Sequence, residues 1–201
     1  MTLIGIWGMA REIITHFHYI HHSGDSQRGF TLLELVFTVV IMGIVIAMAA
    51  PSFNGLIESN KIKRLATEIE WLLVQAKSEA VMQGKNIYVN APLVPGTRIN
   101  SGWCVFTSTD VSDKSCDDID TNSLSSIDSV NFSGVTFENS KTLTQFSFDP
   151  IYGKPKNIGF GGNFDYQLGG YHLKTVIYNE TGRIYTCLQA GSNKLSNYEK
   201  C

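Results

Sequence analysis

The stretch Phe30–Ala50, FTLLELVFTVVIMGIVIAMAA, is the most apolar part of the chain, and Glu34 is the only charged residue among its 21 residues. A helix rises about 1.5 Å per residue, so this stretch would be about 31 Å long and would match the hydrocarbon core of a bilayer. A core helix of a soluble protein is rarely apolar on all sides over this length. The stretch therefore predicts a membrane-spanning helix.

Glu34 is the exception within this helix, and it lies in about the first turn. A carboxylate in a membrane segment costs several kcal/mol unless it is at the interface, protonated or paired. A neighbouring subunit or a newly formed amino terminus could supply the paired cation. From the residue alone, an interfacial glutamate without a special role and a paired functional glutamate both remain open.

The stretch Arg28–Leu35, RGFTLLEL, resembles the processing motif of type IV pilins and of type II secretion pseudopilins. The resemblance implies that residues 1–29 are a leader that prepilin peptidase removes between Gly29 and Phe30. It also implies N-methylation of Phe30 and pairing of Glu34 with the Phe30 amine of an adjacent subunit. The implied location is the inner membrane, crossed once, with the C-terminal head in the periplasm. The implied partners are other pilins or pseudopilins and an inner-membrane assembly platform.

A second helical pattern follows Pro51, which is expected to kink the helix because proline removes a backbone hydrogen bond. Charged residues occupy one side of this pattern, and Gly84 follows it as a candidate C-cap. We therefore expect a transmembrane half at 30–53 and an amphipathic half at 54–84 that lies across a sheet. The apolar residues that recur at spacings of three and four are Ile62, Leu65, Ala66, Ile69, Leu72, Leu73, Ala76, Ala80 and Val81.

Beyond Gly84 the hydrophobic period shortens towards two, as in β-strands. Clusters of Gly, Asn, Asp, Ser and Pro separate the runs, which is typical of antiparallel strands joined by turns. The last two runs, joined by residues 179–182, predict a hairpin, and the polar, acidic segment 108–133 predicts a loop. The fold class is α+β, with a long bent N-terminal helix packed on an antiparallel head at 85–201. The predicted strands are at 87–89, 103–107, 135–137, 146–148, 175–178 and 183–187.

All four cysteines, Cys104, Cys116, Cys187 and Cys201, lie in the predicted head. An even number beyond a membrane segment indicates an oxidising compartment and two disulfides, for which three pairings exist. We favour Cys104–Cys116 and Cys187–Cys201, because each pair encloses one polar, turn-rich loop. No C-x-x-C pair or suitably spaced histidine supports zinc, so no metal is expected.

The head carries no recognisable catalytic arrangement. There is no G-x-S-x-G nucleophile motif and no phosphate-binding loop, and His172 is the only histidine that remains after leader removal. The aspartates near residue 117 lack the order and the closing glutamate of a calcium loop. The sequence therefore predicts a protein that is not an enzyme, with no catalytic residues and no cofactor.

Three short stretches of the head resemble the GspH/FimT branch of minor pilins and pseudopilins: GWCVF at 102–106, FSFDP at 146–150 and TGRI at 181–184. In FimT-like members a C-terminal G-R-x-R motif is associated with binding of incoming DNA during natural transformation. Here that motif reads GRIY, so Tyr185 replaces the second arginine.

The charge distribution bears on this DNA-binding hypothesis. Residues 85–140 have a balance of −4, whereas residues 141–201 have a balance of +3, and a locally basic region is one mark of nucleic-acid contact. An ordinary solvated surface gives the same balance, so both interpretations stay open. The candidate DNA-binding residues are Lys154, Lys156, Lys174, Arg183 and Tyr185.

Three functions follow from these observations. The first is a FimT-like minor pilin that helps to assemble or prime a type IV pilus and contributes to DNA uptake. The second is a GspH-like pseudopilin of a type II secretion system. The third is a membrane-anchored periplasmic enzyme or sensor with a pilin-like leader, which would require a catalytic cluster that the sequence does not contain.

Overall fold

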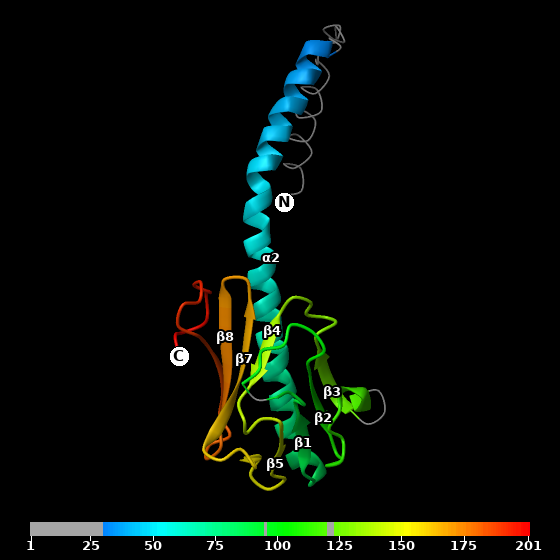
Figure 1. The fold of residues 1–201 in the computed structure, drawn as a ribbon, viewed down its shortest axis with the longest axis vertical. Coiled ribbons are helices and arrows are strands. Elements are labelled where there is room, and N and C mark those ends of the chain that lie inside the picture. Colours follow the sequence, from blue (N-terminus) through cyan, green and yellow to red (C-terminus); the bar gives the residue numbers. More distant parts are fainter. Residues whose placement is uncertain (1–29, 95, 120–122) are drawn as a thin grey trace, which may run out of the picture. The chain divides into compact units, whose positions relative to one another are not determined.

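The computed structural model describes residues 30–94, 96–119 and 123–201, so the predicted leader and Gly29 lie outside the described residues. The chain forms two compact units, Met1–Ala47 and Met48–Cys201. Helix α2, Leu32–Gln83, belongs to both units, and the β-strands belong to the second, which we call the head unit (Figure 1).

Local hydrogen bonds define both ends of α2. At its start, the backbone N–H of Glu34 donates to Thr31 Oγ1 at 3.3 Å, which is half of a capping box. At its end, Gly84 has a φ of +64°, and Lys85 N–H donates to the Ala80 carbonyl at 3.3 Å. This arrangement is a Schellman cap, so the prediction for Gly84 is confirmed. The predicted resumption of the helix after Pro51 is also confirmed, whereas the kink there stays a prediction.

In the first unit, the side chains of residues 30–47 are exposed. Among the described residues, no single helix is by itself both long enough and apolar enough to span a membrane. The stretches Leu32–Met48 and Phe53–Gln83, which follow one another in the chain, meet the length and apolarity criterion when they are taken together. The transmembrane half at 30–53 therefore stays a prediction.

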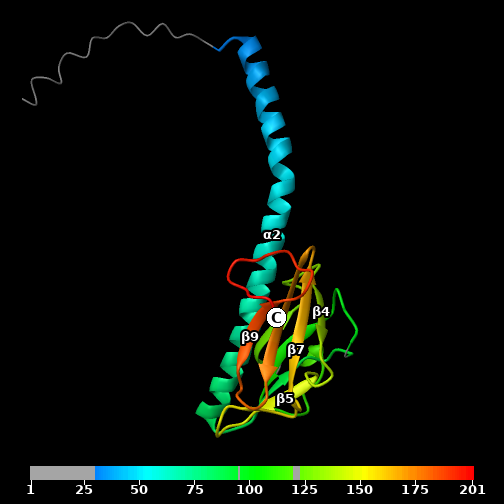
Figure 2. The same cartoon turned by 90° about the vertical axis from the view of Figure 1, so that its left-hand side faces the viewer.

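The head unit contains two antiparallel sheets beside α2 (Figures 1 and 2). The first has the strand order β3-β2-β1-β5-β6, and the second has the order β4-β7-β8-β9. The first sheet consists of β1 Ile87–Asn90, β2 Cys104–Ser108, β3 Ser123–Asp128, β5 Gln145–Phe148 and β6 Pro155–Lys156. The second consists of β4 Thr136–Asn139, β7 Gly161–Leu168, β8 Tyr171–Tyr178 and β9 Ile184–Leu188.

One hydrophobic core joins the amphipathic part of α2 to both sheets. The Trp103 and Phe137 rings stack with centroids 4.7 Å apart, and Phe137 also stacks on Tyr166. The predicted packing of this half of the helix on a sheet is confirmed, with one exception: Val81 is half exposed, because it lies about 100° around the helix from the buried Ala80. The buried helix residues are Ile62, Leu65, Ala66, Ile69, Leu72, Leu73, Ala76 and Ala80.

Each of the six predicted runs overlaps a strand, and β8 and β9 form the predicted hairpin, with Val176 opposite Tyr185. The prediction of a loop throughout 108–133 is wrong at β3, which pairs with β2. Strand β3 reads SLSSID, and Ile127 is its only buried residue, so backbone pairing rather than apolar alternation defines it. Strand β7 was also not predicted, because polar residues separate its apolar residues Phe164, Tyr166 and Leu168 and two glycines begin it, so it contains no continuous apolar run.

Candidate functional site

The segment from Phe30 to Met48 presents apolar side chains around a single carboxylate. Phe30 is 77% exposed, and Glu34 is also exposed. No described residue forms an ion pair with the Glu34 carboxylate, although its backbone N–H is held by Thr31. The hydroxyl of Thr38 donates to the Leu35 carbonyl at 2.8 Å, so this polar group is satisfied within the helix. The Glu34 carboxylate is therefore the group of this segment that needs a positively charged partner from another molecule, because an unpaired charge is costly in an apolar environment.

A second apolar surface lies on the face of α2 that points away from the head core. We call it the outer stripe: Phe53, Ile57, Trp71, Val74 and Met82, all exposed, with Trp71 at 67%. Sequence reasoning missed this stripe, although its residues recur at helical spacing opposite the core positions. Apolar surface gathered on one face indicates an interaction surface.

Beside the stripe, a hollow of about 620 Å³ separates the last turns of α2 from the start of β9. Val74 and Met82 line it from the helix, Ile184 lines it from the start of β9, and Arg183 lines it from the turn just before β9. The Lys77 ammonium also lines it and donates to the Gly182 carbonyl at 3.2 Å. The hollow thus combines apolar walls with two cationic groups.

Arg183 and Tyr185, two of the candidate DNA-binding residues, are in direct contact. The Arg183 guanidinium lies over the Tyr185 ring, 5.1 Å from its centroid, and Tyr185 stacks on Tyr178 with centroids 5.9 Å apart. The hydrogen bond between the two tyrosine hydroxyls raises the pKa of Tyr185. The result is a ladder of one cation and two aromatic rings, in which Arg183 and Tyr178 are exposed and Tyr185 is partly buried.

The three candidate lysines are placed differently. Lys156 pairs with Asp149 at 2.9 Å, and this hydrogen bond lowers the pKa of Asp149. Lys154 lies 5.9 Å from the centre of the Tyr152 ring, on the same turn between β5 and β6. Lys174 is on β8, where it lies 3.7 Å from Asp165. Two of the three lysines therefore have a carboxylate partner, which reduces the positive charge available to an anionic ligand.

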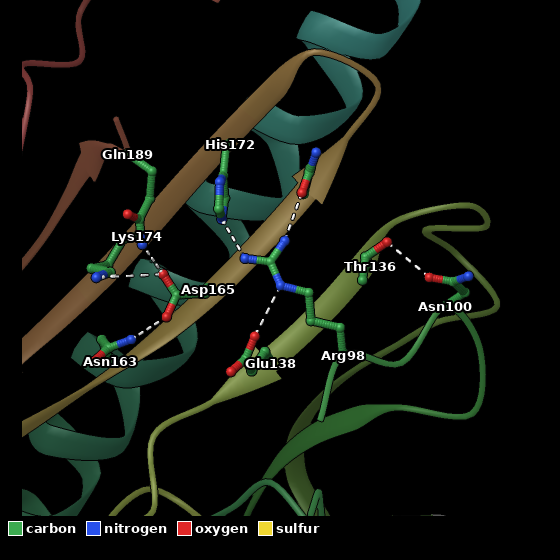
Figure 3. Close-up of polar contacts among 10 residues, drawn as sticks. Arg98, Asn100, Thr136, Glu138, Asn163, Asp165, His172, Lys174 and Gln189 are labelled. Carbon is green, nitrogen blue, oxygen red and sulfur yellow. Dashed lines mark hydrogen bonds and ion pairs between the residues drawn. The ribbon is translucent and has the colours of Figure 1, made fainter. Parts of the chain in front are cut away.

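A polar network covers the sheet face that points away from the core (Figure 3). Arg98 donates to Glu138 at 3.0 Å and to Gln167 at 2.6 Å, and it lies 3.3 Å from His172 Nε2. Burial, followed by the charge of Arg98, lowers the pKa of His172. Within the described parts of the chain, no group of three or more His, Cys, Asp or Glu side chains is arranged to hold a metal ion.

The structure contains disulfides Cys104–Cys116 and Cys187–Cys201, the pairing favoured above. The second one holds the C-terminal segment against β9, where Leu188 N–H donates to the Glu199 carbonyl at 2.7 Å and Cys201 N–H donates to the Leu188 carbonyl at 3.0 Å. Leu195, within the segment thus closed, is buried. The C-terminal segment is therefore part of the folded head.

Two family models match the chain: type II transport protein GspH over residues 65–182, and the prokaryotic N-terminal methylation motif over residues 25–50. A fimbrial protein of Pseudomonas aeruginosa is 34% identical over 90 residues, which are 45% of this chain and 57% of the relative. The type IV major fimbrial protein FimA of Dichelobacter nodosus is 33% identical over 70 residues, 31% of this chain and 42% of the relative. The chain thus spans about half the length of these relatives.

Among solved structures, the type IV minor pilin FimU of Pseudomonas aeruginosa is similar in two crystal forms. One has a TM-score of 0.49 at 18% identity and covers 68% of this chain and 94% of that chain. The other has a TM-score of 0.45 at 19% identity and covers 62% of this chain and 90% of that chain.

The GspH model matches more than half of the chain, and the methylation motif covers the segment that contains Glu34. Members of this family are structural subunits rather than enzymes. The chain belongs to the GspH family of type IV pilin-like proteins.

Proposed function

We propose that this protein is a minor pilin that assembles with other pilins in a type IV pilus. The observation that carries this proposal is the exposed apolar segment Phe30–Met48, in which Glu34 is the only charge and lacks an ionic partner among the described residues. Such a segment is stable in a bilayer or between similar helices, but not in water. The fimbrial relatives, which match this chain over 90 residues at 34% identity, support the choice of a pilus.

Glu34 would acquire its partner during assembly. Cleavage between Gly29 and Phe30 by prepilin peptidase creates an amine four residues before Glu34, and this amine is then N-methylated. When the subunit enters the filament, its Glu34 pairs with the Phe30 amine of an adjacent subunit. The pairing removes the penalty of an isolated buried charge, because each ion supplies the other's counter-charge in a low-dielectric environment. Before assembly the subunit would span the inner membrane once, with its head in the periplasm and in contact with the assembly platform.

The test compares Glu34→Gln with Thr38→Val in the full-length protein. Both variants should remain in the membrane fraction, since neither reduces the apolarity of the segment. Glu34→Gln should be absent from filaments sheared off the cells, whereas Thr38→Val should be incorporated like the wild type, because the Thr38 hydroxyl bonds only within its own helix. Mass spectrometry of the mature protein should find N-methylated Phe30. Wild-type levels of Glu34→Gln in filaments would rule out the proposed pairing.

A pseudopilin role in type II protein secretion is the second candidate, and the match to the GspH family over residues 65–182 favours it. Deletion of the gene separates the two roles. Loss of surface pili with unchanged protein secretion supports the pilus, and loss of secretion with intact pili supports the pseudopilus.

DNA binding is a finer part of the pilus proposal, supported by the ladder of Arg183, Tyr185 and Tyr178, whose outer members Arg183 and Tyr178 are exposed. Arginine binds phosphate, and exposed aromatic rings stack on bases. The test is salt-dependent DNA binding by the head fragment 53–201, which contains every buried residue of the described chain. Wild type is compared with Arg183→Ala and with a Lys154→Ala/Lys156→Ala double variant. Binding that weakens steeply with salt and falls in both variants supports DNA capture. A folded, oxidised head that does not bind at low salt excludes it.

A further inference from the structure

Three large apolar side chains on two neighbouring turns of the head are largely exposed to solvent. Phe160, in the turn before β7, is 97% exposed, whereas Ile151 and Tyr152, in the turn between β5 and β6, are 73% and 72% exposed. We call these three residues the turn tips. They contribute little to the core, and exposing them to water is unfavourable, so their position indicates an external contact.

The two turns lie at the same end of the head, and specific contacts fix them there. Asn179, in the β8–β9 turn, donates to the Gly159 carbonyl. The β8–β9 turn also approaches the β5–β6 turn closely at Gly182. A Cβ atom added to Gly182 would lie only 3.1 Å from the Gly153 carbonyl oxygen. Both views show these turns at the end of the head where α2 ends (Figures 1 and 2).

Cationic side chains surround the turn tips. Lys154 lies over the Tyr152 ring, and Arg183 lines a hollow of about 480 Å³ together with Phe160. Lys77 reaches the same place from α2, through its bond to the Gly182 carbonyl. Of the nearby carboxylates, Asp149 is paired with Lys156, and Glu180 lines the Phe160 hollow. Among these residues the four cations Lys77, Lys154, Lys156 and Arg183 outnumber the two carboxylates, although the whole chain has a net charge of −2.

We propose that the turn tips insert into an anionic lipid surface and that Lys77, Lys154 and Arg183 bind its headgroups. A rigid protein partner would need separate pockets for side chains that project from two different turns. A fluid bilayer interface accepts such projections without preformed pockets, and aromatic side chains are favoured at its headgroup level. The positive rim complements anionic phospholipids. This inference does not depend on the pilus proposal, since it concerns the head unit and not the apolar segment Phe30–Met48.

The experiment measures flotation of the head fragment 53–201 with vesicles of two compositions. One is phosphatidylcholine alone, and the other contains about 30% phosphatidylglycerol, which supplies negative surface charge. We expect at least about fivefold more bound protein on the anionic vesicles, and we expect about 0.5 M NaCl to abolish that difference by screening.

The variants distinguish insertion of the turn tips from nonspecific adsorption of the fragment to vesicles. Ile151→Ser/Phe160→Ser should reduce binding to anionic vesicles at least about fivefold, because it removes the apolar insertion. Val130→Ser is the control: Val130 is 83% exposed on the turn after β3, at the Cys104 end of β2, whereas the end of α2 leads into β1 beside the Ser108 end of β2, so its loss should leave binding unchanged. Thermal unfolding of the oxidised fragments verifies that each variant is folded.

Two outcomes would overturn the proposal. The first is a folded head that binds neither vesicle at low salt, which would assign the turn tips to a protein partner. The second is equal binding by the wild type and the double serine variant. Either result leaves the Glu34 experiment unaffected, because that test is read from filaments.

Discussion

Nη2 of Arg98 lies 3.3 Å from Nε2 of His172 on the outer face of β8. An arginine guanidinium has donors only, so Nε2 must be the acceptor. His172 is therefore neutral in this arrangement and carries its proton on Nδ1. The lowered pKa of His172 has burial as its main cause and the charge of Arg98 as the next, and it agrees with this assignment.

This relationship predicts acid sensitivity of the head. Lys174 also disfavours protonation of His172, whereas Asp165 and Glu138 favour it. The folded-state pKa lies below the unfolded value of 6.5, so the unfolded chain binds more protons as the pH falls below about 6.5. The urea midpoint of the head fragment should therefore decrease between about pH 7 and pH 5.

His172→Gln is the control, because glutamine does not titrate and its carbonyl can still accept from Arg98. The variant should show a smaller decrease in midpoint over the same pH range. The lowered pKa values of Asp110 and Asp149 affect stability only in a more acidic range, near and below about pH 4, so they do not obscure this window. Parallel pH dependence of both proteins would contradict the assigned role of His172.

The Cys187–Cys201 bond should stabilise the head and hold its C-terminal segment. It closes a loop over a sequence separation of 14, for which the chain-entropy description gives about 3 kcal/mol. Cys187→Ser/Cys201→Ser should lower the free energy of unfolding by about this amount and make residues 189–201 sensitive to limited proteolysis. Urea unfolding and mass spectrometry of the digest measure the two effects.

Cys104→Ser/Cys116→Ser provides the comparison, since its sequence separation of 12 gives a similar loop. It should lower stability by a similar amount but leave the C-terminal segment resistant to protease. If both double variants expose the C-terminal segment equally, the bond to Cys201 has no local role.

The elements with a strong periodic signal could be predicted from the sequence, and those defined by long-range pairing could not. The burial of the apolar residues from Ile62 to Ala80 could be predicted, because residues three and four apart lie on the same face of a helix. Strand β3 has almost no apolar alternation, and its partner β2 defines it. The contact between Arg183 and Tyr185 joins residues close in sequence, whereas Arg98 meets His172 across 74 positions. No local pattern marks such a contact.

Tyr166 should make the head sensitive to alkaline conditions. Its hydroxyl is buried and shares hydrogen bonds with Thr175 and, through it, with Thr186, each at 2.8 Å. Burial raises the pKa of Tyr166, so the unfolded chain loses this proton near pH 10 while the folded chain retains it. Stability should therefore fall above about pH 10. Tyr166→Phe should lower the free energy of unfolding by about 1 kcal/mol at neutral pH. The difference in this free energy between the variant and the wild type should be smaller at about pH 11, because only the wild type loses stability through the Tyr166 hydroxyl. A deficit that is constant with pH would contradict this prediction.

Gly161, the first residue of β7, should not tolerate a side chain. Its φ is +149°, and a Cβ there would lie 2.7 Å from the backbone carbonyl oxygen of Ile177 on β8. Neither backbone can move without breaking the β7–β8 pairing, in which Gly161 is opposite Tyr178. Gly161→Ala should therefore lower the free energy of unfolding by about 3 kcal/mol, since conformational strain adds to steric overlap.

Gly191→Ala is the matched control, because Gly191 also has a positive φ, +84°, but nothing lies within 4 Å of its Cβ position. It should cost only about 1 kcal/mol from conformational strain. Urea unfolding of both variants measures the difference, and equal losses would mean that the close approach of Ile177 contributes nothing.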